Sequence, residues 1–147
     1  MTFTPLNPEY EADLRRMFQS QGLMGHLGAR LTRIEPGLVE IEAAFRSGLS
    51  QQNGFFHAGV SSALADTAGG FAAFTLFPPG RDVLTVEFKI NLMAPAKGDR
   101  LRARGAVVRS GRSLTVCELD VFVTDGGREV ACAKGLQTLM RMEPRPA

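Results

Sequence analysis

The chain has 147 residues, of which 44% are hydrophobic and 22% are charged, proportions that suit one globular domain with one core. Its formal net charge is +2, with acidic and basic residues mixed along the chain, which disfavours a dedicated nucleic-acid-binding protein. No apolar run approaches the roughly 20 residues of a membrane span, and residues 1–5 do not resemble a signal peptide. We therefore expect a single cytoplasmic domain over residues 1–147, without nucleic-acid or membrane partners.

The first predicted element is a short amphipathic helix over residues 8–20. Asn7 is a candidate N-cap, Pro8 suits the first helical position, and Gly22 is the expected stop. Apolar side chains recur at helical spacing at Tyr10, Leu14, Met17 and Phe18. We assign residues 1–24 to an N-terminal helical segment.

A β-hairpin and a loop are predicted next. The turn signal Pro36-Gly37 separates apolar residues within 29–34 from an alternating strand over 39–45. Residues 47–57 are rich in Gly, Gln and Asn and are expected to form a loop.

A long helix follows from about Ala58 to Phe77, and Pro78-Pro79-Gly80 ends it. Apolar side chains lie all round this helix, so we expect it to be buried on most sides. The Gly69-Gly70 pair lowers its helical propensity and indicates close packing against a neighbouring element.

Four strands are predicted in the rest of the chain, because the apolar period changes to two. They cover residues 84–92, 101–107, 115–123 and 130–140, and residues 143–147 form a tail. In the last strand the alternating set is Val130, Cys132, Lys134, Leu136, Thr138 and Met140. Cys117 and Cys132 lack metal-type or redox-type spacing, so we expect two reduced, buried thiols.

This order of elements predicts an α+β fold in which a curved antiparallel sheet wraps around one long central helix. One sheet leaves the other side of that helix and its own edge strands uncovered. We therefore expect the chain to associate with itself.

One carboxylate stands out within the long helix. Asp66 is the only charged residue between His57 and Arg81. Burying an unpaired carboxylate is costly, which makes Asp66 a candidate catalytic group. The alternative is that Asp66 is exposed on a polar strip of the helix, to which Ser62 and Thr67 could belong, or is simply hydrogen-bonded.

The start of the same helix is a second candidate feature. Ala58 and Gly59 lie in its first turn, where free N–H groups and the helix dipole favour an anion or a carbonyl oxygen. His57, just before them, either caps the helix or touches a ligand. Asp66 follows Ala58 by eight positions, which on one helix is about 12 Å. A single site using both residues therefore needs two chains with antiparallel helices, and it would occur twice in a dimer.

The run from Gln51 to Gly70, QQNGFFHAGVSSALADTAGG, resembles the signature of hot-dog-fold thioesterases of the phenylacetic-acid (PaaI) type. That family's pattern is Asn, two residues, Gly, two residues, His-Gly-Gly, and Asp nine residues after the His. Gly54, His57, Gly59 and Asp66 match it, while Gln51 replaces the Asn and Ala58 replaces the first Gly. The run from Leu84 to Ala96, with Pro95 near its end, also resembles a family strand, and the resemblance covers roughly residues 25–140.

The resemblance implies a hot-dog fold and hydrolysis of an acyl-CoA thioester without a cofactor or a metal. Asp66 would be nucleophile or general base, and the Ala58 N–H would polarise the thioester carbonyl. Gln51 would position substrate or water, and Thr85 would hold the water. His57 and Gly59 would shape the helix entry.

Substrate contacts are expected from Asn53, Gly54 and Phe56 in the loop. The phosphates of CoA attract basic side chains, for which Arg81, Lys97, Arg109 and Arg112 are candidates; solvated hairpin charges are the alternative for each. The acyl group would lie among phenylalanines that are otherwise plain core. These are Phe55, Phe56, Phe71, Phe74 and Phe88.

Two other functions remain open at this point. A non-catalytic acyl-CoA or fatty-acyl binder of the same fold is favoured by the Gln51 replacement. A hot-dog dehydratase or hydratase needs a His paired with an acid, for which only His26 and His57 are available. For the thioesterase, the expected assembly is a homodimer or homotetramer.

Overall fold

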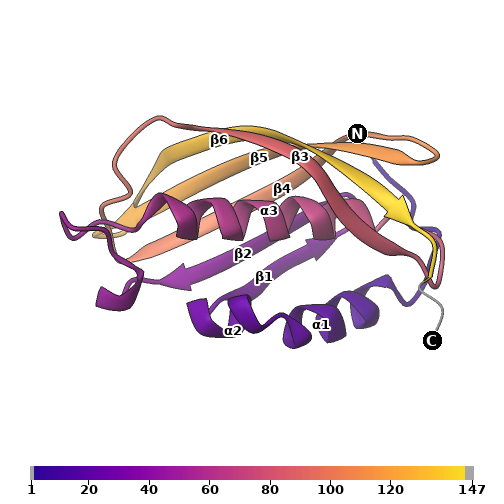
Figure 1. Cartoon of the computed structure of the whole chain (residues 1–147), viewed down its shortest axis with the longest axis horizontal. Helices are drawn as coiled ribbons and strands as arrows, with labels where there is room; N and C mark the ends of the chain where they lie inside the picture. Colours follow the sequence, from indigo (N-terminus) through magenta and orange to yellow (C-terminus); the bar gives the residue numbers. More distant parts are fainter. Residues whose placement is uncertain (1, 145–147) are drawn as a thin grey trace.

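A computed structural model describes residues 2–144 and contains a six-stranded antiparallel sheet curved around one long helix (Figure 1). The helices are α1 (Tyr10–Ser20), α2 (Gly22–Leu27) and α3 (Ala58–Phe74), with a 3-10 turn, η1 (Ser47–Leu49). The strands are β1 (Arg30–Glu35), β2 (Leu38–Ala44), β3 (Asp82–Leu92), β4 (Arg100–Ser110), β5 (Leu114–Asp125) and β6 (Arg128–Met142). They lie side by side in the order β1-β2-β4-β5-β6-β3. The predicted architecture is confirmed.

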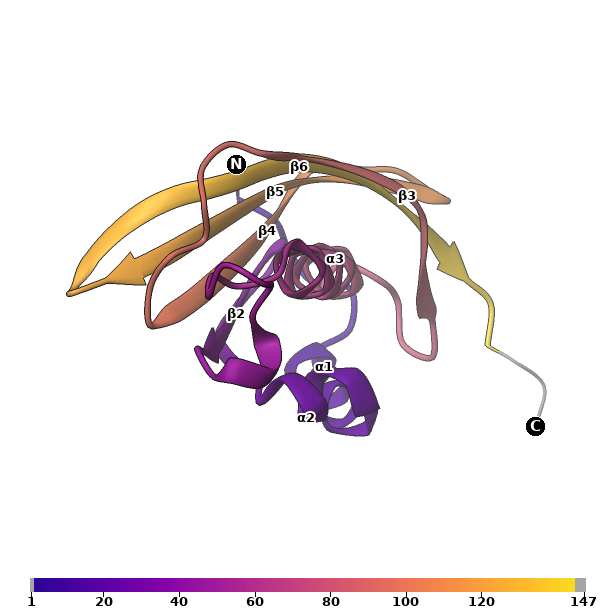
Figure 2. The same cartoon turned by 60° about the vertical axis from the view of Figure 1, so that its left-hand side comes forward.

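Helix α3 lies in the hollow of the sheet, and the strands arch over it (Figure 2). Alternate residues of β2, β4 and β5 are buried against it, as their period-two patterns predicted. Gly105 of β4 allows the closest approach, because a Cβ there would lie 2.4 Å from backbone atoms of Ala68 and Gly69. The helix backbone therefore rests directly on β4.

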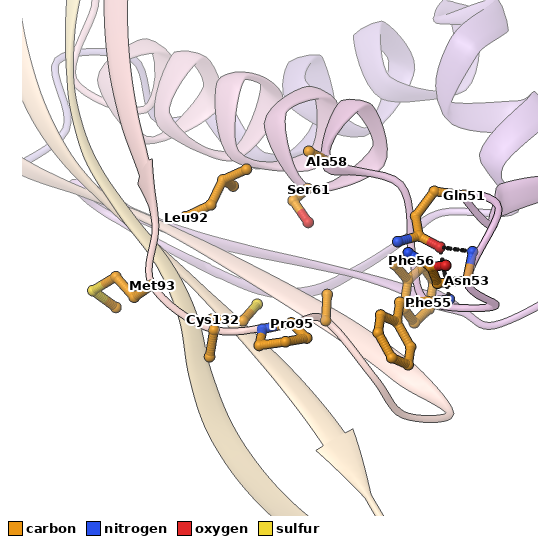
Figure 3. A pocket seen from close by; sticks show the side chains of 12 residues that line it. Gln51, Asn53, Phe55, Phe56, Ala58, Ser61, Leu92, Met93, Pro95 and Cys132 are labelled. Carbon is orange, nitrogen blue, oxygen red and sulfur yellow. Dashed lines mark hydrogen bonds between the residues drawn. The ribbon is translucent and has the colours of Figure 1, made fainter.

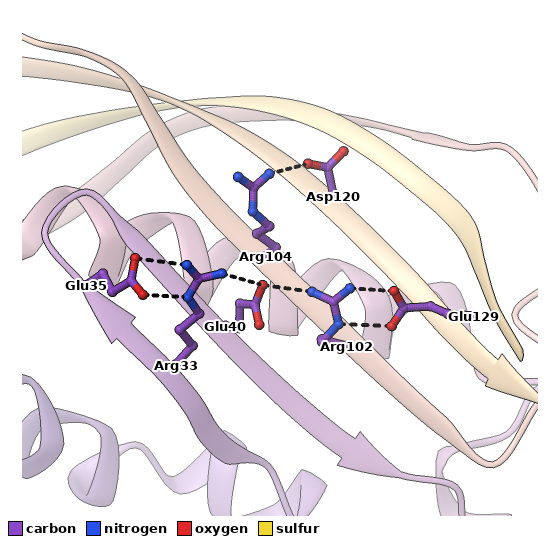
Figure 4. Close-up of polar contacts among 7 residues, drawn as sticks. All are labelled: Arg33, Glu35, Glu40, Arg102, Arg104, Asp120 and Glu129. Carbon is purple, nitrogen blue, oxygen red and sulfur yellow. Dashed lines mark hydrogen bonds and ion pairs between the residues drawn. The ribbon is translucent and has the colours of Figure 1, made fainter. Parts of the chain in front are cut away.

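The outer face of the sheet carries ion pairs instead (Figure 4). Arg102 bridges Glu40 at 2.8 Å and Glu129 at 2.5 Å, and Arg104 pairs with Asp120 at 3.2 Å. Such pairs contribute about 0–1 kcal/mol each, so they mark a solvated face more than a source of stability. The two cavities beside Ala58 and Asp66 lie on the opposite face, because residues of α3 line both of them.

The N-terminal segment differs from the prediction. Helix α1 ends at Ser20, as predicted, but Gly22 then begins a second helix, α2, which Gly28 ends in the left-handed conformation at φ 64°. Asn7 does not cap α1 directly, since its Oδ1 accepts from the Glu9 N–H at 3.0 Å and the helix begins at Tyr10. The long helix α3 ends at Phe74, three residues before its predicted end at Phe77.

Two β-bulges reverse the alternation that the sequence suggested. The β5–β6 pairing passes from Val121–Ala133 to Phe122–Ala131, so Cys132 is the extra residue. Beyond it, Gly135, Gln137 and Leu139 are buried, and the predicted inward set at 134–140 was wrong. A second bulge at Val86 shifts β3 in the same way. Of the predicted tail, residues 145–147 lie outside the described range.

Candidate active site

The loop before α3 is tied down by its backbone. The Phe56 N–H donates to the Ala96 carbonyl at 3.0 Å, and the His57 N–H donates to Leu49 at 2.9 Å. Gly54 turns the chain with φ 80°, a conformation that favours glycine. The loop therefore holds the start of α3 in one place, beside the segment that joins β3 to β4.

His57 caps α3, the first of its two expected roles. Its Nδ1 accepts a hydrogen bond from the Gly59 N–H at 2.8 Å. A Cβ at position 59 would lie 2.9 Å from that nitrogen, so glycine makes room for the cap. In the part of the chain that the structure describes, the Ala58 N–H has no internal hydrogen-bond partner. The helix start thus leaves a backbone donor available.

A cavity of about 490 Å³ opens beside this donor (Figure 3). Most of its walls are apolar, and polar groups come from three side chains, Gln51, Asn53 and Ser61. Its other lining residues are Phe55, Phe56, Ala58, Leu92, Met93, Ala94, Pro95, Ala96 and Cys132. An apolar pocket with a few convergent polar groups is the usual form of a small-molecule site.

Gln51 presents its amide nitrogen to this cavity. Its Oε1 accepts hydrogen bonds from the Asn53 N–H and, at 3.4 Å, from the Phe55 N–H. The amide nitrogen points toward the side of the pocket where Ala58 and Ser61 lie (Figure 3). Gln51 therefore offers a donor to a ligand, while its own loop uses the acceptor.

Asp66 does not line this cavity but a second one, of about 370 Å³, with Gln21, Met24 and Phe71 among its walls. The carboxylate is partly buried, and its Oδ1 accepts from the Thr85 hydroxyl at 2.7 Å and from Gln137 Nε2 at 2.6 Å. Oδ2 has no hydrogen-bond partner among residues 2–144. Asp66 is thus hydrogen-bonded by side chains of β3 and β6, and it shares its partial exposure with Ser62 and Thr67, so both the catalytic interpretation and its structural alternative stay open.

Ala58 and Asp66 lie on the same helix, eight positions apart, which corresponds to about 12 Å along the helix axis. They also line different cavities of the chain. No single small group contacts both residues within one chain.

The basic candidates fall at two ends of the molecule. Lys97 directly follows the pocket-lining run that ends at Ala96. Arg109 and Arg112 are exposed near the β4–β5 turn, and Arg81 pairs with Glu143 beyond the C-terminal end of α3. Within one chain, only Lys97 is adjacent to the pocket at Ala58.

The five phenylalanines that were expected around the acyl group lie in different places. Phe55 and Phe56 line the Ala58 cavity, whereas Phe71 lines the Asp66 cavity. Phe74 lies in the core, and Phe88 is half-exposed on β3.

Ser61 and Gln137 are polar residues of this region that the sequence reasoning missed. Both are buried, Ser61 one helical turn after Ala58 and Gln137 against Asp66. The helical spacing of Ser61 from Ala58 was a usable signal. Gln137 was hidden by the bulge at Cys132, which changes the face on which it lies.

The described residues contain no cluster of metal ligands, and the thiol beside the first cavity has a raised pKa. Among residues 2–144, no three His, Cys, Asp or Glu side chains gather as a metal site. Burial raises the pKa of the Cys132 thiol, in the pocket wall, to about 11. Over the same range, no helix has the length and apolar character required to span a membrane.

Comparisons with known proteins identify the family of this chain. Residues 53–130 match the sequence profile of the thioesterase superfamily. The proofreading thioesterase EntH of Klebsiella pneumoniae is 30% identical over 117 residues, covering 80% of this chain and 85% of that protein.

Two solved structures share the fold. A thioesterase family protein from Silicibacter pomeroyi superposes with a TM-score of 0.90 at 42% identity, covering 91% of this chain and 98% of that one. The Escherichia coli PaaI protein from the phenylacetic acid degradation operon superposes with a TM-score of 0.82 at 18% identity, covering 95% and 97% of the two chains. The protein therefore belongs to the thioesterase superfamily, as a thioester hydrolase with the hot-dog fold of the PaaI type.

Proposed function

We propose that this protein hydrolyses acyl-CoA thioesters to a free acid and CoA, with Asp66 as its catalytic carboxylate. The observation that carries the proposal is the state of that carboxylate. One of its oxygens is held by two donors, while the other has no partner in the described chain. A partly buried, oriented carboxylate suits a general base or a nucleophile.

The thioester carbonyl oxygen is held by donors at the start of α3. Ala58, whose N–H has no partner among residues 2–144, lines the first cavity, and the Gln51 amide nitrogen points toward the same side of it (Figure 3). Negative charge that develops on the carbonyl oxygen during attack is stabilised by such preorganised donors and by the helix N-terminus. His57 contributes by capping the helix through its Nδ1.

As general base, Asp66 takes a proton from water while the water oxygen bonds to the carbonyl carbon. The C–S bond then breaks, and the proton passes from Asp66 to the CoA sulfur. As nucleophile, the carboxylate itself bonds to the carbonyl carbon and expels CoA, and water then cleaves the mixed anhydride. A single turnover in ¹⁸O-water separates these routes. Only the nucleophilic route, with water attacking the Asp66 carbonyl, leaves label in the protein.

The complete site is formed by two copies of the chain. Asp66 of one copy faces the Ala58 end of the other, because both groups cannot reach one carbonyl from a single helix. An exposed apolar strip on edge strand β3 supports this association. Phe88 and Leu92 pair with the buried residues Gln137 and Ala133 and therefore face the helix side of the sheet. They are nevertheless 41% and 59% exposed, which an antiparallel homodimer, alone or within a homotetramer, would cover.

CoA would lie along the mouth of the first cavity, where Lys97 is the nearest basic candidate for a phosphate. Asn53 and Gly54 form the loop that borders this mouth, and Phe55 and Phe56 contribute apolar wall. Arg81, Arg109 and Arg112 reach a CoA molecule only if the second copy brings them close. Their contribution is tested by KM in charge-removing variants.

The deciding experiment measures hydrolysis of a panel of acyl-CoAs by the wild type and by Asp66→Asn. Loss of a catalytic acid–base group typically lowers kcat by about 10²- to 10⁴-fold. Equal rates for the two proteins on every hydrolysed substrate would remove Asp66 from the mechanism.

A non-catalytic acyl-CoA binder is the second candidate. The observation favouring it is that the loop itself uses Gln51 Oε1, so this oxygen cannot hold the attacking water. Saturable binding of CoA esters without turnover across the panel would decide for the binder. A hydratase has no such support, since no hydrogen bond or ion pair in residues 2–144 joins a histidine to an acidic side chain.

A further inference from the structure

Gln137 contacts Asp66 from the opposite side of the helix–sheet interface. It lies on β6 and is 1% exposed. Its Nε2 donates to Asp66 Oδ1 at 2.6 Å and lies 3.1 Å from both the Thr85 hydroxyl oxygen and the Asp66 carbonyl oxygen. The buried amide of Gln137 thus contacts both Asp66 and Thr85, the other side chain that donates to the Asp66 carboxylate.

These contacts have only one consistent direction. An amide nitrogen donates and never accepts, and the two hydrogens of Gln137 Nε2 are shared among Asp66 Oδ1, the Asp66 carbonyl oxygen and the Thr85 hydroxyl oxygen, so Thr85 accepts from Gln137 in the contact between them. The Thr85 hydroxyl has a single hydrogen, which it then gives to Asp66 Oδ1 at 2.7 Å. Gln137 therefore orients Asp66 twice, once directly and once by setting the direction of the Thr85 hydroxyl. Both bonds end on Oδ1, so Oδ2 is the oxygen left for chemistry.

One end of this glutamine is unfavourable for stability. Its Oε1 is buried and has no hydrogen-bond partner in the described part of the chain. An unsatisfied buried acceptor costs about 1–3 kcal/mol, whereas an apolar side chain of similar size has no such cost. A purely structural residue facing the core here would be apolar, as its strand neighbour Leu139 is.

Gly69 of α3 makes room for this amide. A Cβ at position 69 would lie 1.9 Å from Gln137 Oε1 and 2.6 Å from Leu119 Cδ2. A glycine in the interior of a helix costs about 1 kcal/mol relative to alanine. The helix glycine and the strand glutamine therefore belong to one arrangement, in which a helix glycine and an unsatisfied amide oxygen accompany the contacts to Asp66.

We propose that Gln137 is a positioning residue for Asp66, that it fixes Oδ1 together with Thr85 so that Oδ2 faces the reacting group, and that Gly69 provides the space. This inference rests on the proposed role of Asp66 in thioester hydrolysis. It adds two residues, from β6 and α3, to the machinery of that site.

The test compares Gln137→Leu and Gly69→Ala with the wild type and with Asp66→Asn, using an acyl-CoA that the wild type hydrolyses. Gln19→Leu, on the exposed side of α1, is the matched control. We expect kcat to fall about 10- to 100-fold in the two test variants, because small misplacements of a catalytic group have costs of this size. We expect KM, and the Kd of an unreactive CoA thioether, to change less than about twofold.

Activity per folded molecule, measured beside the melting temperature, separates positioning from structure. A positioning role predicts that kcat per folded molecule falls in Gln137→Leu whichever way the melting temperature moves, since the variant removes both the unsatisfied oxygen and the donors to Asp66 and Thr85. A lower melting temperature together with unchanged kcat per folded molecule would show that Gln137 is only structural.

The failures of the two proposals can be told apart. An inactive Asp66→Asn beside a fully active Gln137→Leu overturns the positioning role and leaves the catalytic role of Asp66 intact. An active Asp66→Asn, or a wild type that hydrolyses no substrate of the panel, overturns both.

Discussion

Mixing two inactive variants tests directly whether the site is shared between chains. The first variant is Asp66→Asn, which removes the carboxylate. The second is Ala58→Pro, which removes the backbone N–H at the first position of α3. Proline is well tolerated at that position, and His57 already has ψ 140°, in the range that a residue before proline prefers. The second variant therefore loses one hydrogen-bond donor with little change of fold.

The expected activities follow from the arrangement of the two groups. Ala58→Pro alone should lower kcat by about 10²- to 10³-fold, as expected for losing one carbonyl-binding donor. In a mixed dimer, one site combines the intact Ala58 of one chain with the intact Asp66 of the other, and the second site lacks both. Random exchange makes half of the dimers mixed, so the mixture should recover about a quarter of wild-type activity, and a purified mixed dimer about half.

The assay is CoA release after the two variants are unfolded together in denaturant and refolded as a mixture. Ala58→Pro mixed with the double variant Ala58→Pro/Asp66→Asn is the control, since no intact site arises in it. Activity no higher than the average of the two parents, in a preparation where differently tagged chains copurify, would refute the two-chain site.

Four further predictions concern the groups around this site. Thr85→Val should lower kcat about tenfold with little change of KM in steady-state assays, because Asp66 Oδ1 loses one of its two donors. Phe88→Glu should shift the protein toward monomer in light scattering and lower its activity in parallel, because a carboxylate is costly to bury in an apolar interface. Gly105→Ala should lower the free energy of unfolding, measured in urea, by about 1–3 kcal/mol or more, because its Cβ would meet the backbone of α3. Cys117 and Cys132 should react slowly with Ellman's reagent at pH 8 in the native protein and rapidly in guanidinium, because burial raises the pKa of Cys132 to about 11 and of Cys117 to about 12.

Each of these predictions has a contrary outcome. An unchanged kcat for Thr85→Val would mean that Gln137 alone holds the carboxylate. A Phe88→Glu protein that remains associated would place the interface elsewhere than β3. A Gly105→Ala protein as stable as wild type would show that α3 moves away from β4 without cost. Fast native thiol labelling would show that the sheet opens near Cys117 or Cys132.

Much of the fold was predictable because its signals are local. Three such signals depend only on neighbouring residues, and the structure has each feature where it was expected. They are the apolar residues on most sides of α3, the turn at Pro36-Gly37, and the alternation of β4 and β5. The unusual position of Asp66 was also visible, since one acid in a long apolar helix stands out in any sequence.

The N-terminal segment was less predictable. Gly22 is a helix-stop signal by composition, yet α2 begins there because Met24 and Leu27 pack into the core. Packing of this kind outweighs a local propensity of about 1 kcal/mol.

The sequence by itself thus determined the order of the elements, the central helix and its acid. Only the tertiary structure decided which residues surround that acid, because the contacts of Asp66 with Thr85 and Gln137 join segments far apart in the chain. The bulge at Cys132 inserts one residue and turns Gln137 from the outer face to the helix face. Apolar residues on both faces of β6, such as Leu136 and Leu139, leave the alternation ambiguous, so strand pairing had to settle it.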